Sequence, residues 1–494
     1  MPKLDFEALK SHLWESANIL RGAIDASDYK NYIFGLLFLK RLSDVFDEEA
    51  ERLIKEGKSK KIAFEDPDEH EFFVPPKSHW KHLTGIAHNL GDVINKANDA
   101  LEEHNSALEG VLSATDFNDK DRLPDATLAK LIVHFSKVRL RNEDLAEPDI
   151  LGRAYEYLIA QFADDAGKKG GEFYTPKEVV SLLVEILDPR EGMYVCDPAC
   201  GSGGMLVQAV HHLRALRQNV KNIVLHGQER NVGTWAICKM NMLLHGIPGA
   251  RIEKGDTIRE PKLLAKGQLH QYDIVIANPP FSLKNWGVES AEHDAFGRFK
   301  YGLPPKSYGD FAFVEHMIAV LKPYGRAGVV LPHGVLFRGG AEGKIRQGLL
   351  EEDLVEAVVG LPSNLFYGAS IPACLFIINK KKPAQRKGKV FFLYGARDFE
   401  QLKNQNKLRP RDIEKIVKAY RGYATEEKYC RPVSLDEIRR NDYNLNIPRY
   451  VDITEEEPPI DVQQTIDELT KLRKERAEAE AKVEGYLKEL GYKV

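Results

Sequence analysis

The most distinctive chemistry in this chain lies in one tetrapeptide, Asn278-Pro279-Pro280-Phe281. It follows an apolar run, Asp273 to Ala277, that is typical of a buried strand. Because proline has no backbone N–H, this turn offers two acceptors, the Asn278 amide oxygen and the Pro279 carbonyl. Two adjacent acceptors suit an exocyclic amine with its two N–H donors, and Phe281 provides a face on which an extruded base can stack. We predict that the tetrapeptide is catalytic; the alternative is a strand closed by a Pro-Pro turn.

A glycine-rich turn upstream predicts a cofactor site. The segment Asp197-Pro198-Ala199-Cys200-Gly201-Ser202-Gly203-Gly204 joins a short strand to an apolar helix that starts near Met205. Glycines let a ligand approach the backbone without interference from Cβ atoms. The turn lacks the lysine of a phosphate loop, which disfavours a nucleoside triphosphate as its ligand. It also lacks the full GxGxxG spacing, which disfavours NAD or FAD. Taken alone, it is equally consistent with a plain strand-to-helix turn.

Two acidic residues follow at the ends of the next expected strands. A carboxylate at the end of the second strand is the usual partner of ribose hydroxyls, which it accepts in a bidentate way. Glu229 alone would be read as a surface or helix-capping residue, but its register with the glycine turn favours the ribose role. Asp256 follows the third strand, where it can read an adenine amine.

The elements that must position these residues form an α/β pattern. From about residue 175, short apolar strands alternate with helical segments, which predicts a mainly parallel sheet with helices on both faces. The expected strands are Tyr194–Cys196, Ile223–Leu225, Asp273–Ala277, Ala327–Leu331, Val355–Val359 and Cys374–Ile378. Residues 1–150 are expected to be helical, with Tyr32–Leu39 as a buried helix core. Near the C-terminus an apolar stripe with heptad-like spacing predicts a helix that packs on its own domain or pairs with another subunit.

Composition sets outer limits on the function. The chain has 494 residues with a formal charge of −4, which allows two or three domains of ordinary globular composition. We expect no membrane span, no signal peptide and no metal site, because no apolar run of about 18 residues and no His/Cys set of zinc spacing is present. Five scattered cysteines suit a reducing cytoplasm. A protein that grips DNA alone is usually basic, so a DNA-binding role predicts a partner that supplies positive charge.

Together these motifs resemble those of S-adenosylmethionine-dependent DNA adenine methyltransferases of the gamma class. A third matching segment, Gly171-Glu172-Phe173-Tyr174-Thr175-Pro176-Lys177, lines the methionine end of the cofactor pocket in that family. The resemblance implies that the cofactor is S-adenosyl-L-methionine. It also implies a cofactor-binding role for Glu172, Phe173, Tyr174, Thr175, Pro176, Lys177, Asp197, Gly201, Ser202, Gly203, Gly204, Glu229, Asp256 and Asn278.

The whole chain is similar to the methylation subunit of type I restriction–modification systems. The stretches that carry this similarity are Asp28–Lys40, Leu361–Tyr367 and Asn444–Tyr450. The resemblance implies a class I methyltransferase domain over residues 151–430, with a mainly parallel seven-stranded sheet covered by helices on both faces. It further implies an all-α N-terminal domain over residues 1–150 and a C-terminal extension over residues 431–494, whose terminal helix contacts another subunit.

The family also implies a substrate and partners. The methyl group goes to N6 of an adenine flipped out of double-stranded DNA, in a complex of two methylation subunits with one specificity subunit, joined by restriction subunits in the full assembly. The alternatives are a glutamine-N5 protein methyltransferase, which the long terminal extensions disfavour, and a non-catalytic scaffold of the same fold. The intact Asp197, Glu229 and Asn278 argue against the scaffold. A fused nuclease or translocating ATPase is disfavoured because the chain lacks an acid-x-Lys core and a phosphate-loop lysine.

Overall fold

The computed structural model describes residues 3–22, 24, 26–147, 149–165, 175–366, 372–403, 405–454 and 462–492. The chain divides into two compact units, Met1–Val451 and Asp452–Val494. Within the described ranges, no helix is long and apolar enough to cross a membrane.

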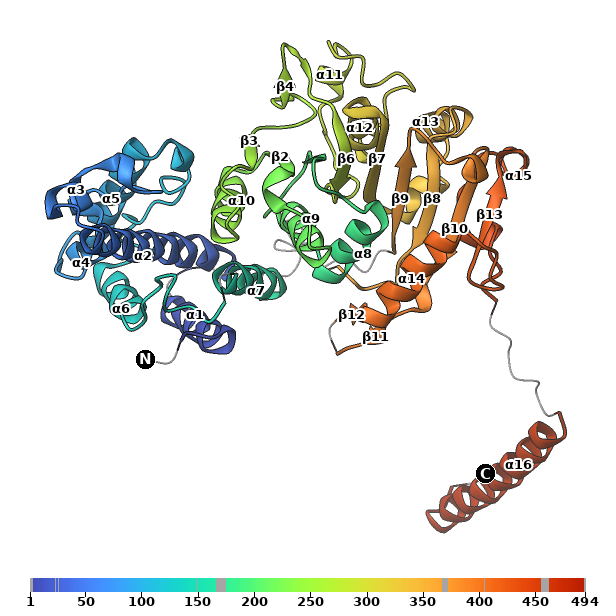
Figure 1. Cartoon of the computed structure of the whole chain (residues 1–494). Helices are drawn as coiled ribbons and strands as arrows, with labels where there is room; N and C mark the ends of the chain where they lie inside the picture. The colour runs from blue at the N-terminus through green and yellow to red at the C-terminus, as the bar shows by residue number, and fades with distance from the viewer. Residues whose placement is uncertain are drawn as a thin grey trace. The chain divides into compact units, whose positions relative to one another are not determined.

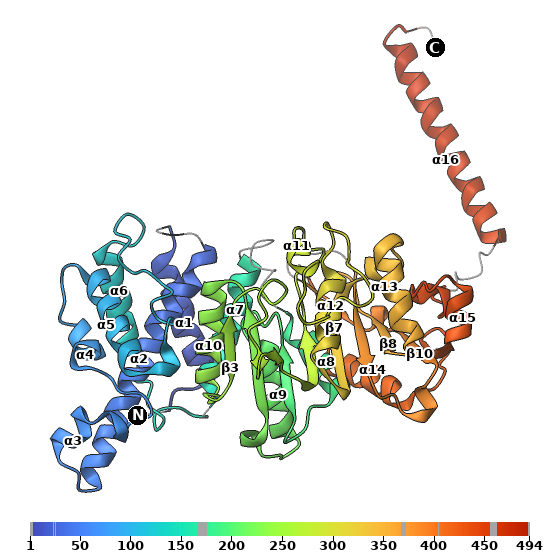
Figure 2. The same cartoon turned by 90° about the horizontal axis from the view of Figure 1, so that it is seen from above.

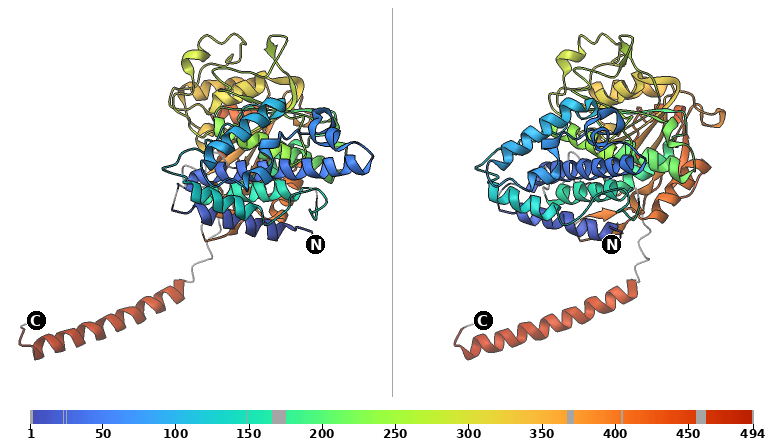
Figure 3. Two further views of the ribbon diagram at one scale, coloured as in Figure 1. Left: turned by 90° about the vertical axis from the view of Figure 1, so that its left-hand side faces the viewer. Right: turned by 60° about the vertical axis from the view of Figure 1, so that its left-hand side comes forward.

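The described part of residues 1–165 folds into seven α-helices, the first six of them within the stretch predicted to be helical. They are α1 Phe6–Leu20, α2 Ala26–Lys55, α3 Lys60–Glu65, α4 Trp80–Leu83, α5 Leu90–His104, α6 Asp125–Phe135 and α7 Ile150–Asp165. The apolar run expected to be a helix core lies in α2, where Ile33, Phe34 and Leu36 are fully buried. The Phe34 ring lies 3.9 Å, centroid to centroid, from that of Tyr155 in α7. In Figure 3 these helices, coloured blue to teal, lie toward the viewer, and α2 runs through the middle of the group.

The second part of this unit is built on one large sheet (Figure 1). Its strands lie in the order β13-β10-β8-β9-β7-β6-β1-β2-β3. Their bounds are β1 Tyr194–Asp197, β2 Val224–Glu229, β3 Arg251–Lys254, β6 Tyr272–Ala277, β7 Leu321–Pro332, β8 Val355–Gly360, β9 Ala373–Asn379, β10 Lys389–Tyr394 and β13 Cys430–Ser434. Only β9 and β13 run antiparallel to their neighbours, so the sheet is mainly parallel, as predicted.

The sheet has nine strands where the sequence predicted seven. The six expected strands and β3 form seven consecutive positions, from β8 to β3, and β10 and β13 extend the sheet beyond β8. β10 is buried along Val390–Leu393, as a central strand should be. β13 is the edge strand and contains Pro432, a residue that sheets tolerate at edges but that weakens a strand prediction. Residues Cys430–Ser434 therefore pair within the sheet, although the predicted C-terminal extension began at residue 431.

Helices cover both faces of the sheet, as the alternating pattern predicted. One face is covered by α8 Lys177–Leu187, α9 Gly204–Ala215, α10 Val232–Leu244 and α14 Pro410–Gly422, and the other by α12 Asp310–Ala319 and α13 Gly340–Glu351. Figure 2 shows α12 and α13 on the side of the sheet opposite α9 and α14. Shorter elements complete the unit: α11 Val288–Ala291, α15 Leu435–Arg440, and the small pairs β4 Leu264–Ala265 with β5 Gln268–Leu269 and β11 Glu400–Gln401 with β12 Asn406–Lys407.

The second compact unit contains a single long helix, α16 Val462–Glu489. Its apolar side chains are exposed by between 48% and 72%: Ile466, Leu469, Leu472, Val483, Tyr486 and, just beyond the helix, Leu490. An apolar stripe of this kind on a helix is a surface that another element can cover.

Candidate active site

Three of the predicted site residues, Asp197, Glu229 and Asn278, gather at one edge of the sheet. Because β6, β1 and β2 are parallel neighbours, their carboxyl ends meet there. Asp197 is the last residue of β1, Glu229 is the last residue of β2, and Asn278 follows β6 directly. The structure thus brings together one residue from each of the three predicted motifs.

The carboxylate of Glu229 holds the glycine-rich turn in place. Its Oε2 accepts a hydrogen bond from the Gly201 N–H at 3.0 Å, and its Oε1 accepts one from the Asn231 N–H at 2.7 Å. A carboxylate has about four lone-pair positions. Glu229 therefore retains acceptor capacity for a pair of ligand hydroxyls while it shapes the turn.

The turn requires glycine for a steric reason at Gly203. Its φ is +83°, and a Cβ atom there would lie 2.5 Å from the Met242 Cε. Two further side chains fix the turn from outside it. Asn241 donates from Nδ2 to the Ser202 carbonyl at 3.0 Å, and the Thr257 hydroxyl donates to the Pro198 carbonyl at 2.6 Å. Neither residue is predictable from the sequence, because Asn241 lies within a helix and Thr257 in a turn, with no local pattern that marks them.

Two desolvated carboxylates give the site an unusual electrostatic character. Asp197 is 2% exposed, and burial raises the pKa of its carboxyl group to about 8, with the Glu229 charge adding to the rise. Burial also raises the pKa of Glu229. Asp197 accepts one hydrogen bond, from the Ala199 N–H at 3.0 Å, and forms no ion pair within the described part of the chain. Such a pair suits a ligand that brings positive charge and hydroxyl donors.

The amide of Asn278 is held in one orientation. Its Nδ2 donates to the Thr175 hydroxyl at 2.9 Å. Its Oδ1 is buried and has no hydrogen-bond partner among the residues that the structure describes. A buried acceptor without a donor is costly, so the geometry presents an oxygen that is ready to accept an N–H group from a bound molecule.

The turn after Asn278 is anchored on both sides. The Phe281 ring meets the edge of Phe366 in a T-shaped arrangement, with centroids 5.7 Å apart. The next residue, Ser282, donates its backbone N–H at 2.9 Å to the buried carboxylate of Asp310. The guanidinium of Arg338 lies 3.5 Å from the same carboxylate, and its Cζ lies over the Tyr308 ring, 4.2 Å from the ring centroid. Asp310 and Arg338 were absent from the sequence prediction, because nothing local marks them.

Asp256, another predicted cofactor residue, forms hydrogen bonds within its own turn. Asp256 closes its own turn: Oδ1 accepts the N–H groups of Ile258 and Arg259 at 3.0 and 3.1 Å, and Oδ2 accepts from the Arg259 guanidinium at 3.1 Å. Little of its acceptor capacity remains for an adenine amine. Glu172, Phe173 and Tyr174 lie outside the described residues.

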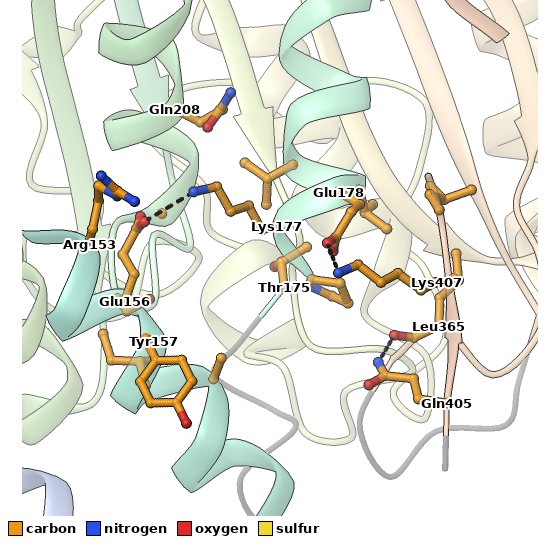
Figure 4. A pocket seen from close by; sticks show the side chains of 18 of the residues that line it. Arg153, Glu156, Tyr157, Thr175, Lys177, Glu178, Gln208, Leu365, Gln405 and Lys407 are labelled. Carbon is orange, nitrogen blue, oxygen red and sulfur yellow. Dashed lines mark hydrogen bonds and ion pairs between the residues drawn. The ribbon is translucent and has the colours of Figure 1, made fainter. Parts of the chain in front are cut away.

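Thr175, Pro176, Lys177, Ser202 and Gly204 border a pocket of about 470 Å³. It lies between α7, α8 and residues 402–408 and is shown in Figure 4. There the Lys177 ammonium points toward the Glu156 carboxylate at 3.9 Å, and Lys407 pairs with Glu178 at 3.3 Å. Lys177 thus reaches across to α7, whereas Thr175 reaches the Asn278 amide.

The fold and this edge define a class I S-adenosylmethionine-dependent methyltransferase. The sequence profile of the N-6 DNA Methylase family matches residues 146–458, and that of the HsdM N-terminal domain matches residues 9–135. The chain is 34% identical to the MjaVIII type I restriction enzyme methylase subunit of Methanocaldococcus jannaschii, over 99% of this chain and 85% of that protein. It is 36% identical to the HindI methylase subunit of Haemophilus influenzae, over 82% of this chain and 93% of that one.

A solved structure agrees with these sequence matches. The crystal structure of the type I restriction–modification methyltransferase subunit from Streptococcus thermophilus superposes with a TM-score of 0.80 at 34% identity, covering 91% of this chain and 100% of that chain. The chain belongs to the N-6 DNA methylases, as a methylase subunit of a type I restriction enzyme. It methylates adenine in DNA and uses S-adenosylmethionine.

Proposed function

We propose that Asn278 and the Pro279 carbonyl accept the two N–H groups of the adenine amine while the base stacks on Phe281. The observation that carries this proposal is the buried, unpartnered Oδ1 of Asn278, whose amide is oriented by Thr175. Two accepted hydrogen bonds draw the nitrogen toward tetrahedral geometry and localise its lone pair. S-adenosylmethionine, when bound, supplies an electrophilic methyl group on a good leaving group.

The residues on the other side of this edge hold the cofactor in the proposal. Glu229 accepts the ribose hydroxyls, and Asp197 faces positive charge that relieves its desolvation. Gly201 to Gly204 allow close backbone approach, and Thr175 to Lys177 contribute from the start of α8. The fit rests on the two desolvated carboxylates and on the open space beside Gly204, where a Cβ would meet no atom within 4 Å among the described residues.

No general base is required in this scheme. The site orients the amine and polarises it, and the methylated amine is acidic enough to release its proton to water. Reaching N6 in a duplex requires that the adenine leave the stack, so we propose that the base is flipped into this edge.

We further propose the assembly in which the subunit works. A specificity subunit reads the DNA sequence and binds α16, two copies of this chain join one specificity subunit, and restriction subunits complete the complex in the cytoplasm. The exposed apolar stripe of α16 and the net charge of −4 support this, because a chain without basic excess needs a partner to hold DNA.

A methyl-transfer assay on duplex DNA tests this proposal. Tritiated S-adenosylmethionine is supplied with and without the specificity subunit, and the labelled nucleoside is identified. We expect label on adenine N6 only when both chains are present. Label with this chain alone would reject the division of labour between subunits. Label on protein but not on DNA, with cofactor binding intact, would move the assignment to glutamine.

A further inference from the structure

A cluster of two histidines and an aspartate lies outside the methyl-transfer site. Asp149 directly precedes α7, His211 lies in α9, and His245 directly follows α10. One potential ligand atom from each side chain lies within 4.8 Å of the other two. Their wide separation along the chain explains why the sequence analysis expected no metal site.

The Asp149 carboxylate lies at hydrogen-bond distance from both imidazoles, close to the spacing of ligands around one ion. Asp149 Oδ1 lies 2.7 Å from His245 Nδ1, and Asp149 Oδ2 lies 3.1 Å from His211 Nε2. Ligand atoms bound at about 2.0–2.2 Å from a shared ion stand about 3.0–3.6 Å apart. Small side-chain shifts therefore suffice to admit an ion, and imidazole with carboxylate is a set that first-row divalent metals prefer.

The buried histidine has the support expected of a metal ligand. The His245 side chain is fully buried, and its Nε2 has no hydrogen-bond partner among the described residues. This nitrogen points to Glu156, whose Oε1 lies 3.9 Å away. With a metal on Nδ1, the neutral ring carries its proton on Nε2, where a shift of about 1 Å brings it into a hydrogen bond with Glu156.

Glycine in α7 makes room for this ring. A Cβ at Gly152 would lie 2.5 Å from three atoms of the His245 imidazole. The helix therefore lies directly against the ring, which fixes the ring plane beside Asp149.

One neighbouring cation, the guanidinium of Arg214, limits the affinity of this cluster for a metal ion. Arg214 lies 3.5 Å from Asp149 Oδ1 and donates to the His245 carbonyl at 3.1 Å. Its charge lowers the affinity for a cation without blocking the imidazole nitrogens. His211 and Asp149 keep 20% and 25% of their side-chain surface exposed, which leaves an entry path and room for water as a further ligand.

We propose that Asp149, His211 and His245 bind one divalent first-row transition-metal ion, such as Zn²⁺. The ion joins the start of α7 to α9 and to the end of α10. Glu156 orients His245 from the second layer of contacts.

Metal titration of the full-length, tag-free protein tests this proposal. Zn²⁺ binding is followed by competition with a chromophoric chelator, and Co²⁺ binding by its visible absorption. We expect one equivalent bound by the wild-type chain. His211→Asn and Asp149→Asn should each weaken binding by about 10-fold or more, as losing a contact in a metal site typically does. His88→Asn, a change at an exposed histidine elsewhere, serves as the matched control and should leave affinity unchanged.

Thermal unfolding provides a second measurement. Zn²⁺ that binds the folded chain should raise its Tm, and this rise should disappear in His211→Asn. Absence of a one-equivalent site in the wild type, or equal affinity in wild type and both ligand variants, would overturn the proposal and leave the three residues as a hydrogen-bonded cluster. Because both readouts are independent of methyl transfer, they do not depend on the proposed catalytic roles.

Discussion

The backbone N–H of Ser282 donates a 2.9 Å hydrogen bond to the carboxylate of Asp310. Asp310 is fully buried at the start of α12, whereas Ser282 is the residue directly after Asn278-Pro279-Pro280-Phe281. Ser282 has a φ of +53°, a backbone conformation that residues other than glycine seldom adopt. The hydrogen bond holds the Ser282 backbone in this conformation. It thereby helps to fix the orientation of the preceding residue, Phe281.

Asp310→Ala is expected to slow methyl transfer through loss of positioning. It removes the charged acceptor of the part-buried Ser282 N–H, which costs about 1–3 kcal/mol. If that energy orients the catalytic turn, kcat falls about 10-fold or more while the Kd for S-adenosylmethionine stays unchanged. Single-turnover transfer and calorimetric cofactor binding measure the two quantities. Asp310→Asn retains an acceptor and should recover much of the rate, whereas a lower Tm with normal kcat in the Ala variant would mean that Asp310 is only structural.

Asn278→Ala removes the acceptor assigned to the adenine amine. We expect kcat to fall by about 10²–10³, which is typical when a hydrogen bond made in the transition state is lost. Thr175→Val should give a smaller loss, because it frees the amide to rotate but leaves the oxygen. Because both residues are also assigned to the cofactor, the rates are compared at saturating S-adenosylmethionine, where a change in cofactor affinity no longer contributes. Full activity in Asn278→Ala would disprove the assigned role.

Glu229→Gln tests the ribose contact. The substitution retains one oxygen acceptor for the glycine turn but removes the charge that strengthens hydrogen bonds to hydroxyls. We expect the Kd for S-adenosylmethionine to rise about 10-fold, with a smaller change in kcat at saturating cofactor. Glu253→Gln on β3 is the matched control. Equal cofactor affinity in Glu229→Gln and the control would reject the ribose role.

The buried Asp197 predicts a pH dependence of stability. Burial raises the pKa of its carboxyl group from 3.8 to about 8 in the cofactor-free protein. The folded chain then keeps a proton that the unfolded chain releases, so the free energy of unfolding falls as pH rises through this window. Asp197→Asn should remove that contribution, and the variant should gain stability relative to wild type between about pH 5 and pH 8. Urea unfolding across this range measures it; a constant difference between the two proteins would contradict the prediction.

Leu469→Glu combined with Leu472→Glu is expected to prevent assembly. Both side chains belong to the exposed apolar stripe of α16. Charges on this stripe should abolish co-elution with the specificity subunit, since burying an unpaired carboxylate is costly. Lys474→Glu, an exposed charged position on the same helix, is the control and should leave the complex intact. Cofactor binding should be normal in both variants, and co-elution of the double variant would place the contact elsewhere.

The sequence by itself determined the parts of this protein that are local. A strand leading into a glycine turn, an acidic residue ending the next strand, and Asn278-Pro279-Pro280-Phe281 after an apolar run are contiguous patterns. Parallel pairing then necessarily brings their ends to one edge. The helical character of residues 1–150 was predictable for the same reason, because apolar periodicity is a property of neighbouring residues.

Tertiary structure alone decided the contacts between distant residues. The Thr175–Asn278 and Ser282–Asp310 hydrogen bonds, and the approach of Asp149, His211 and His245, join residues that no short-range pattern connects. The pairing of β10 with β8, and of the edge strand β13 with β10, likewise joins segments that are distant in the sequence. Local propensity is encoded in neighbouring residues, whereas burial and hydrogen-bond partners depend on how the packed helices and strands meet in space.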